Sequence, residues 1–283
     1  MLDARSLWHL VEERAAATPD LEMLVDDRGR RMTFGAYRTA VQRAAAGLAA
    51  HGVAAGTVVA WQLPTWTNSA VLMGALSRLG GVQVPLQPAL RDAEVRFAIR
   101  HSGTDVLMVP GHWRGYDYPA SARRIAVGQG DLQVLVVRGR LNGMALPDAD
   151  PGGLPRAPVS PADPRHAPVR WVFAGSRATD AAVLDPARAV VRRQRLAVRD
   201  RLAPVFPIAD VGGCVLLASA LMSGCTLLLA EMSGPPTWRF LARERVTLVG
   251  LTDFDGRVTV TRQVEDLIAD RDIRRLAACG RVS

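Results

Sequence analysis

Residues 57–110 decide the fold: TVVAWQLPTWTNSAVLMGALSRLGGVQVPLQPALRDAEVRFAIRHSGTDVLMVP. Three short apolar runs in it, TVVAWQL, VQVPL and DVLMVP, have the length and composition of buried strands. Two amphipathic segments separate these runs and predict helices over Thr65–Leu79 and Arg91–His101, each followed by a glycine stop. Because strands alternate with helices, the stretch predicts right-handed βαβ units and a parallel sheet.

The flanking residues extend this pattern toward the N-terminus and as far as residue 141. Residues 3–18 have helical spacing that ends at a Thr-Pro pair, LEMLVD and RMT predict a hairpin, and Phe34–His51 is an alanine-rich helix. RRIAV and LQVLVV predict two further strands. HWRGYDY, residues 112–118, gathers aromatic side chains on a loop, and it fits either a binding lip or a turn packed on its own side chains.

A proline-rich segment divides the chain. Residues 142–168 contain many prolines and few large apolar residues, which is typical of a linker or an extended surface crossing. We therefore predict an N-terminal α/β subdomain over 1–141 and a second α/β subdomain over 169–283. The fold class is α/β, with two subdomains built on mainly parallel sheets.

Beyond the linker the α/β alternation resumes. VRWVFA predicts a strand, Asp185 followed by Pro186 predicts the start of a helix that runs to Leu202, and TLVGLT predicts a later strand. PPTWRFLARERV predicts a helix, and we expect a helix near Val264–Ala269 and a last strand at RRLAACG. The uncharged run Val211–Ala230 predicts a helix over Asp210–Met222 and a buried strand, CTLLLAE, rather than a transmembrane span, because glycines and serines interrupt it.

The basic residues exclude a set of reactions. The formal net charge is +8, and all 35 basic residues are arginine, so a Schiff base, a lysine nucleophile and a P-loop lysine are excluded. Ala, Arg, Gly, Pro and Val have GC-rich codons, so a GC-rich gene explains the excess of basic residues better than nucleic-acid binding does. Between residues 188 and 201, an arginine run lacks the aromatic interleaving of a base-stacking surface, which favours a solvated helix face over an acidic partner. The run consists of Arg188, Arg192, Arg193, Arg195, Arg199 and Arg201.

The sequence indicates neither a metal site nor the catalytic triad of a hydrolase. The three cysteines form no CxxC pair, and none has a histidine at metal-ligand spacing, so no metal site is predicted. The five histidines are scattered and indicate no catalytic triad. Sparse cysteines and an N-terminus without an apolar signal core lead us to expect a cytoplasmic protein.

One candidate phosphate site lies in RWVFAGSRATDAAVLDPAR, residues 170–188. A strand, a loop of small residues and a helix N-terminus in this order are a natural place to hold a phosphate. The loop, however, has one glycine and no lysine.

Three stretches resemble, in the same order, segments of the AMP-forming adenylating superfamily. This superfamily includes acyl- and aryl-CoA synthetases, luciferases and peptide-synthetase adenylation domains. The stretches are RMTFGAYRTAVQRAAAGLAAHGVAAGTVVAWQLPTWTNSAVLMGALSRLGGVQVPLQPALRDAEVRFAIRHSGTDVLMV (31–109), LAPVFPIADVGGCVLLASALMSGCTLLLAE (202–231) and FLARERVTLVGLTDF (240–254). The resemblance implies the front half of such an enzyme's large domain, with Ser283 just short of the adenine-stacking segment.

In that superfamily, the strand equivalent to Trp171–Phe173 leads into a Ser/Thr/Gly-rich loop that ends in Pro-Lys-Gly and wraps the ATP phosphates. The resemblance therefore implies that Gly175, Ser176, Arg177 and Thr179 are remnants of this phosphate loop. The Pro-Lys-Gly is absent, and Asp180 brings negative charge close to the phosphate position. We interpret the loop as one that has lost its function, since arginine does not replace lysine there.

The resemblance also implies an acyl pocket, with Phe206, Asp210, Gly212 and Gly213 as candidate lining residues. Asp210 stands where the family usually has a pocket histidine, and capping the following helix is the favoured role for it. Neither this segment nor the phosphate loop provides a catalytic residue.

Three functions are compatible with the sequence. The first is a degenerate acyl-CoA-synthetase-like protein, a pseudoenzyme of fatty acid metabolism without ATP-dependent ligase activity of its own. It would bind a carboxylate or acyl-CoA and form a homo-oligomer or associate with a partner chain. The second is one half of a split carboxylate–CoA ligase, and only this reading implies ATP and Mg²⁺ as cofactors. The third, an arginine-rich nucleic-acid-binding protein, is less favoured.

Overall fold

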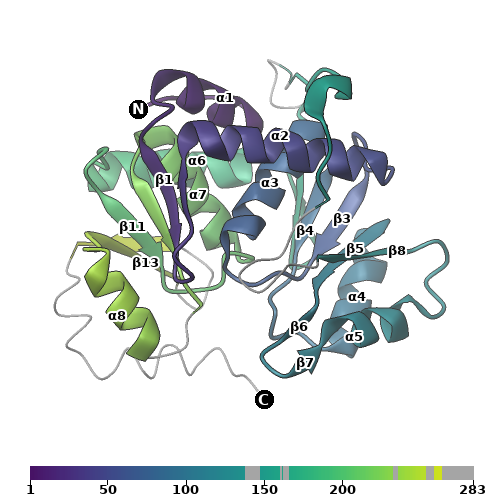
Figure 1. Cartoon of the computed structure of the whole chain (residues 1–283). Helices are drawn as coiled ribbons and strands as arrows, with labels where there is room; N and C mark the ends of the chain where they lie inside the picture. Colours follow the sequence, from purple (N-terminus) through teal and green to yellow (C-terminus); the bar gives the residue numbers. More distant parts are fainter. Residues whose placement is uncertain (138–146, 160, 162–165, 232–234, 253–257, 263–283) are drawn as a thin grey trace.

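The computed structural model describes residues 1–137, 147–159, 161, 166–231, 235–252 and 258–262. Two six-stranded sheets and a small hairpin form the β-structure (Figure 1). The helices fill the space between the sheets and cover their outer faces. This arrangement confirms the α/β fold with two mainly parallel sheets.

The first sheet has the strand order β10-β9-β4-β3-β5-β8. Five of its strands run parallel, and only β10 is antiparallel to its neighbour. Its strands are β3 (Val58–Trp61), β4 (Val82–Pro85), β5 (Val106–Pro110), β8 (Gln133–Val137), β9 (Trp171–Phe173) and β10 (Ser176–Ala178). The three apolar runs of residues 57–110 therefore form its centre, as predicted.

The second sheet has the order β14-β13-β11-β12-β1-β2. Its four central strands run parallel, and an antiparallel strand closes each edge. Its strands are β1 (Glu22–Asp26), β2 (Arg31–Thr33), β11 (Arg201–Pro204), β12 (Thr226–Leu229), β13 (Leu248–Thr252) and β14 (Val258–Thr261). A separate hairpin pairs β6 (His112–Trp113) with β7 (Tyr116–Asp117), so HWRGYDY forms a turn.

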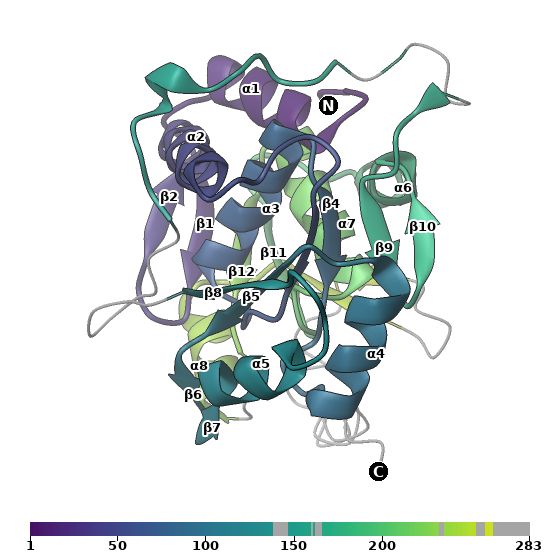
Figure 2. The same ribbon diagram turned by 90° about the vertical axis from the view of Figure 1, so that its right-hand side faces the viewer.

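Helices make three layers around the two sheets. Of the α-helices in the described residues, five lie between the sheets, two cover the outer face of the first sheet, and one covers the outer face of the second (Figures 1 and 2). The inner ones are α1 (Leu7–Ala17), α2 (Phe34–Ala50), α3 (Thr67–Leu79), α6 (Ala181–Gln194) and α7 (Val211–Ser223). The outer ones are α4 (Asp92–Ser102), α5 (Tyr118–Ala126) and α8 (Pro235–Arg243).

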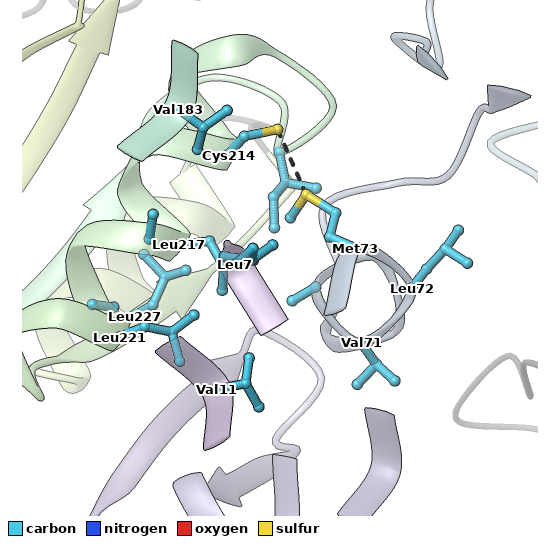
Figure 3. Close-up of a cluster of buried hydrophobic side chains, with 14 of the residues drawn as sticks. Leu7, Val11, Val71, Leu72, Met73, Val183, Cys214, Leu217, Leu221 and Leu227 are labelled. Carbon is cyan, nitrogen blue, oxygen red and sulfur yellow. Dashed lines mark hydrogen bonds between the residues drawn. The ribbon is translucent and has the colours of Figure 1, made fainter. Parts of the chain in front are cut away.

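Helices α3 and α7 form the centre of the inner layer because they are apolar on nearly every face, and such a helix is stable only when it is surrounded. The Cys214 thiol of α7 lies 3.6 Å from the Met73 sulfur of α3 (Figure 3). Each helix ends at a glycine in the left-handed conformation, Gly80 and Gly224. Among the described residues, no helix is long and apolar enough to cross a membrane, and Val211–Ala230 divides into α7 and β12 as expected.

Two local predictions were wrong. RRIAV is part of α5, because Asp117 accepts a hydrogen bond from the N–H of Ala120 at 2.9 Å and Ile125 packs inward on the helical period. The helix expected to start at Pro186 begins at Ala181 and ends at Gln194, so Pro186 lies inside it. Leu202 belongs to strand β11. The expected elements at 264–269 and RRLAACG lie outside the described residues.

The sheets do not follow the division at residues 142–168. Strand β1 pairs with β12, and β9 pairs with β4, so each sheet takes strands from both sides of the segment. Residues 147–159 cross over α2 and α3 and include one short 3-10 helix, η1 (Pro151–Gly153) (Figure 2). Arg43 of α2 pairs with Asp148 at 2.9 Å, and Arg78 of α3 donates to the carbonyl of Pro155 at 2.7 Å.

Candidate functional site

The predicted phosphate-loop residues lie on a tight hairpin. Ala174 and Gly175 form a two-residue turn between β9 and β10, with φ values of +46° and +84°. Two consecutive residues with positive φ are typical of the type I′ turn that joins adjacent antiparallel strands. The sequence pattern indicated a loop here, and the second strand was missed because SRA is short and polar.

The hairpin packs against the end of α4. A Cβ on Gly175 would lie 2.9 Å from the ring of His101, so the turn approaches that side chain closely. Arg177 donates to the carbonyl of Ser102 at 3.3 Å, which orients its guanidinium toward the helix end. Ser176 is exposed, and Thr179 lies just before α6. The structure thus brings Gly175, Ser176 and Arg177 together on a short strand connection.

Asp180 is buried beyond the end of this hairpin that lies opposite the turn. Its carboxylate accepts a hydrogen bond from Nε1 of Trp171 at 2.9 Å and another from the N–H of Leu7. Burial raises the pKa of Asp180, while these hydrogen bonds and the charge of Arg170 act in the opposite direction. Asp180 therefore joins β9 to α1 and faces the protein interior.

Replacing Asp180 with asparagine tests this burial. Because the folded-state pKa is raised, the carboxyl is more easily protonated when folded, and stability falls as pH rises above about 4 through that pKa. Asp180→Asn keeps a side-chain acceptor without the charge, so this pH-dependent loss should disappear. Urea unfolding over a pH series measures how the free energy of unfolding of each protein depends on pH. Asp185→Asn, an exposed position on α6, is the control, and the same pH slope in Asp180→Asn and wild type would contradict the expectation.

The predicted acyl-pocket residues lie where β11 leads into α7. Phe206 is buried in the main core, and Gly213 is packed so closely that an added Cβ would lie 2.4 Å from the carbonyl oxygen of Ile208. Gly212 is buried in the first turn of α7. Asp210 caps this helix by accepting from the N–H of Val211 at 2.8 Å, and burial raises its pKa. Its capping role agrees with the sequence interpretation.

Loops from both sheets meet at this corner, which we define as residues 206–213. The N–H of Ile208 donates to the hydroxyl of Thr65 at 3.2 Å, and Gln87 reaches Asp210 at 3.5 Å. Thr65 and Gln87 follow β3 and β4, so the corner lies at the carboxyl ends of parallel strands. Ligands of open α/β sheets bind at such edges.

A cluster of carboxylates that sequence reasoning missed lies at the same edge. Glu231, after β12, accepts a hydrogen bond from the N–H of Thr65, and its own N–H donates to Asp27 at 3.1 Å. Arg114 approaches Glu231 at 4.0 Å. Burial raises the pKa values of both Glu231 and Asp27. Perturbed carboxyl groups at a strand edge are typical of binding or catalytic sites.

Two arginine–tryptophan stacks flank the carboxylates. The guanidinium of Arg28 lies 3.6 Å from the centre of the Trp66 ring, and that of Arg114 lies 4.8 Å from Trp113. The two tryptophan rings meet edge to face at 6.1 Å. The available signal was Asp27 directly after the apolar run LEMLVD and Glu231 at the end of CTLLLAE. It was missed because nothing in the sequence indicates that β1 and β12 are neighbours.

A cavity of about 450 Å³ lies elsewhere, over α2 and the start of α3, and none of the predicted site residues lines it. Among the described residues, no group of three or more His, Cys, Asp or Glu side chains is arranged to hold a metal ion. In the arginine run, Arg188 pairs with Asp3 and Arg201 pairs with Glu22, whereas Arg192, Arg193, Arg195 and Arg199 are exposed.

Comparison with known proteins gives the same family as the sequence resemblance. The AMP-binding enzyme family matches residues 11–169, more than half of the chain. The vibriobactin-specific 2,3-dihydroxybenzoate–AMP ligase of Vibrio cholerae is 29% identical over 136 residues, which cover 48% of this chain and 25% of the ligase.

Solved structures agree in fold. The N-terminal domain of FACL13 from Mycobacterium tuberculosis superposes with a TM-score of 0.71 at 21% identity, covering 88% of this chain and 63% of that one. The o-succinylbenzoate–CoA synthetase of Bacillus subtilis, solved with ATP and magnesium, gives a TM-score of 0.67 at 19% identity, covering 86% of this chain and 62% of that one. The chain thus spans only part of the length of these proteins. The match over residues 11–169, carried by the predicted βαβ units, places the chain in the family of AMP-binding enzymes.

Proposed function

We propose that this chain is a degenerate acyl-CoA-synthetase-like protein that binds a carboxylate or acyl-CoA and has no ATP-dependent ligase activity of its own. The observation that carries this proposal is the two-residue turn at Ala174–Gly175, on the strand that precedes the phosphate loop in the family. A phosphate cradle needs several backbone N–H groups that converge on one point, usually with a nearby cation. A turn of two residues between paired strands offers few such groups.

The charges around the hairpin support the same proposal. No lysine is present in the sequence, and Arg177 is hydrogen-bonded to the end of α4. Asp180 is buried at the opposite end of the hairpin from the turn and supplies no positive charge there. A nucleotide triphosphate at this hairpin would therefore meet one engaged guanidinium and no lysine.

The corner at 206–213 is the proposed site for the acyl or aryl group. Phe206 and the glycines of α7 are buried beneath the corner, and its partly exposed residues are Pro207, Asp210 and Val211. The loops after β3 and β4 adjoin it through Thr65 and Gln87. Asp210 is the charged group of the corner. Its carboxylate opposes a ligand carboxylate, so the proposed affinity for carboxylates rises as pH falls and Asp210 is protonated.

One half of a split carboxylate–CoA ligase is the second candidate. It is favoured by the match to the AMP-binding enzyme family and by the clustered Glu231, Arg28 and Arg114 at the strand edge. A partner polypeptide would then supply the lysine and the adenine-stacking segment, with ATP and Mg²⁺ as cofactors. A neighbouring gene that encodes these parts would support it. We place either form in the cytoplasm, as a homo-oligomer or with a partner chain.

Calorimetric titration tests the proposal. We expect no ATP–Mg binding tighter than about 1 mM, and saturable binding of benzoate, octanoate or octanoyl-CoA without ATP. The o-succinylbenzoate–CoA synthetase of B. subtilis is the positive control for ATP. Asp210→Asn should strengthen carboxylate binding about threefold at neutral pH because it removes the like charge. Micromolar ATP binding, or failure of all three acyl probes to bind, would overturn the proposal.

A further inference from the structure

The cavity over α2 shares no lining residue with the corner at residues 206–213. It is a groove that runs along one face of α2, opposite β2 and the first turn of α3. Its lining combines small apolar side chains with two arginines. Arg30 lies in the β1–β2 turn, and Arg43 lies on α2. The lining residues are Arg30, Met32, Ala36, Thr39, Ala40, Arg43, Ala44, Thr67, Asn68, Val71, Pro147 and Asp148.

The floor of the groove is narrow and apolar. Ala36, Ala40 and Ala44 recur every fourth residue, so they form one stripe along α2. At 1.5 Å per residue the stripe is about 12 Å long. Met32 and Val71 add apolar surface beside it. Methyl side chains leave a channel that suits a slim, unbranched apolar chain.

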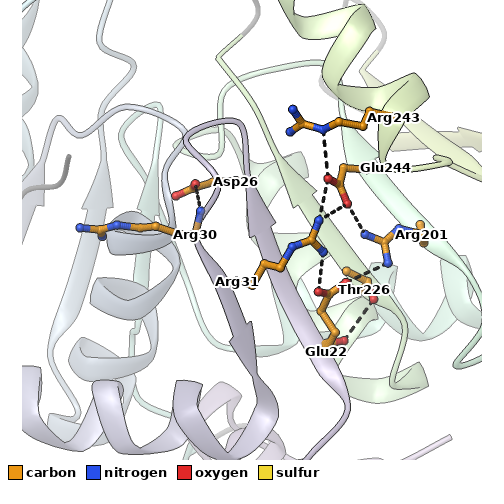
Figure 4. Close-up of polar contacts among 8 residues, drawn as sticks. All are labelled: Glu22, Asp26, Arg30, Arg31, Arg201, Thr226, Arg243 and Glu244. Atoms are coloured by element: carbon orange, nitrogen blue, oxygen red, sulfur yellow. Dashed lines mark hydrogen bonds and ion pairs between the residues drawn. The ribbon is translucent and has the colours of Figure 1, made fainter.

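Arg30 provides positive charge at the β1–β2 end. Its guanidinium donates to the side-chain oxygen of Asn68 at 2.6 Å, and no carboxylate among the described residues pairs with it. Its neighbour Arg31, by contrast, is held by Glu22 and Glu244. Figure 4 shows Arg30 extending away from that ion-pair cluster. The half-buried Arg30 is therefore available for an anionic group.

The proline-rich crossing forms the wall at the other end. Ala149 donates its N–H to the carbonyl of Arg43 at 3.2 Å, and the Arg43 side chain pairs with Asp148. A Cβ on Gly47 would lie 2.2 Å from the backbone of Pro147, so this wall depends on a glycine in the last turn of α2. The second arginine is thus neutralised, and among the described lining residues Arg30 is the one charged group without an ion-pair partner.

From this arrangement we propose that the groove binds an amphiphile with one anionic head and a slim, unbranched apolar tail. The head pairs with Arg30, and the tail lies along the alanine stripe toward the Pro147–Asp148 wall. Charge complementarity selects the head, and the methyl-lined floor selects the tail. The inference does not depend on the acyl site proposed at residues 206–213.

Titration calorimetry with matched probes tests the groove. Decanoate and decyl sulfate share a tail of similar length to the stripe and an anionic head, and both should bind. Decanol and decyltrimethylammonium keep the tail without the anion, and they should bind at least tenfold more weakly. Equal binding of decanol and decanoate would contradict the role of Arg30. Binding of decanoate but not decyl sulfate would narrow the head to a carboxylate and leave the site assignment intact.

Variants locate the binding. Arg30→Met should weaken decanoate binding in the groove about tenfold, since one charge-assisted hydrogen bond is lost. Ala40→Leu should abolish the groove component of decanoate binding by filling the channel. Arg193→Met and Ala189→Leu on α6, outside the groove, are the matched controls and should leave affinity unchanged. Near-UV circular dichroism of each variant establishes that it is folded.

Two further variants distinguish binding in the groove from binding at the corner. Gly47→Ala should displace the Pro147 wall and weaken decanoate binding even though alanine favours the helix. Asp210→Asn should change only decanoate binding at the corner, so the decanoate site that Ala40→Leu removes should persist in Asp210→Asn. If Asp210→Asn alters decanoate binding while Ala40→Leu does not, the ligand occupies the corner, and the groove proposal is wrong while the proposed function stands. Absence of any decanoate binding overturns the groove outright.

Discussion

Arg14→Met should lower the free energy of unfolding by about 3 kcal/mol, because it removes two charge-assisted hydrogen bonds from the core. Arg14 is only 6% exposed. Its Nε and Nη2 donate to the carbonyl oxygens of Leu221 and Met222, both at 2.7 Å. These carbonyls belong to the last turn of α7, where no further residue of the helix can donate to them.

The charge of Arg14 is balanced chiefly by that helix end. Burial lowers the pKa of Arg14, but a guanidinium remains protonated at neutral pH, and the negative end of the α7 dipole favours it. Urea unfolding followed by circular dichroism measures the loss. Arg5→Met, at an exposed position of the same segment, is the control. A change below about 1 kcal/mol in Arg14→Met would show that the carbonyls find other donors, since an apolar replacement can relieve the burial of a charge.

Glu244→Gln should lower stability by about 2 kcal/mol at neutral pH. The Glu244 side chain accepts from Arg31 at 2.7 Å and from Arg201 at 2.9 Å, and Arg31 also pairs with Glu22 (Figure 4). Removing the central carboxylate leaves two guanidinium groups with Glu22 alone. We expect a smaller loss of stability than for breaking a fully buried ion pair, because Arg31 is about half exposed and water screens its charge.

The pH dependence of Glu244 is set by opposing effects. Burial alone would raise its pKa, but hydrogen bonds and charges from Arg31, Arg201 and Arg243 lower it. A lowered pKa means that the stabilisation is complete above the unfolded value of about 4.5 and is lost as pH falls through the folded value. The difference between wild type and Glu244→Gln should therefore shrink in acid. A difference that is constant from pH 7 to about 3 would contradict the ion-pair explanation.

The sequence predicted the elements whose pattern is local. The βαβ units of residues 57–110 and the division of Val211–Ala230 into α7 and β12 depend on apolar periodicity and glycine stops, which neighbouring residues determine. RRIAV was assigned wrongly because a short apolar run fits both a strand and one face of a helix. The hydrogen bond from Ala120 to Asp117 resolves this ambiguity in the folded chain.

Contacts between residues far apart in the sequence could not be predicted from local patterns. Apolar strands do not specify their neighbours, so the pairing of β1 with β12 and of β9 with β4 could not be obtained from one sequence. The carboxylates Asp27 and Glu231 were missed for the same reason. The groove was missed because its wall, Pro147, belongs to a segment whose composition indicates only an extended chain.

The pairing of β1 with β12 has a consequence for how the chain acquires its structure. Leu24 lies opposite Leu227, about 200 residues further along the chain. The N-terminal strand leaves the ribosome long before its parallel neighbour exists, and it has only β2 to pair with in the meantime. Such a high contact order makes closure of this sheet slow and delays it until β12 has been synthesised. During translation, the strand composed of Glu22–Asp26 is an exposed hydrophobic edge that chaperones are suited to protect.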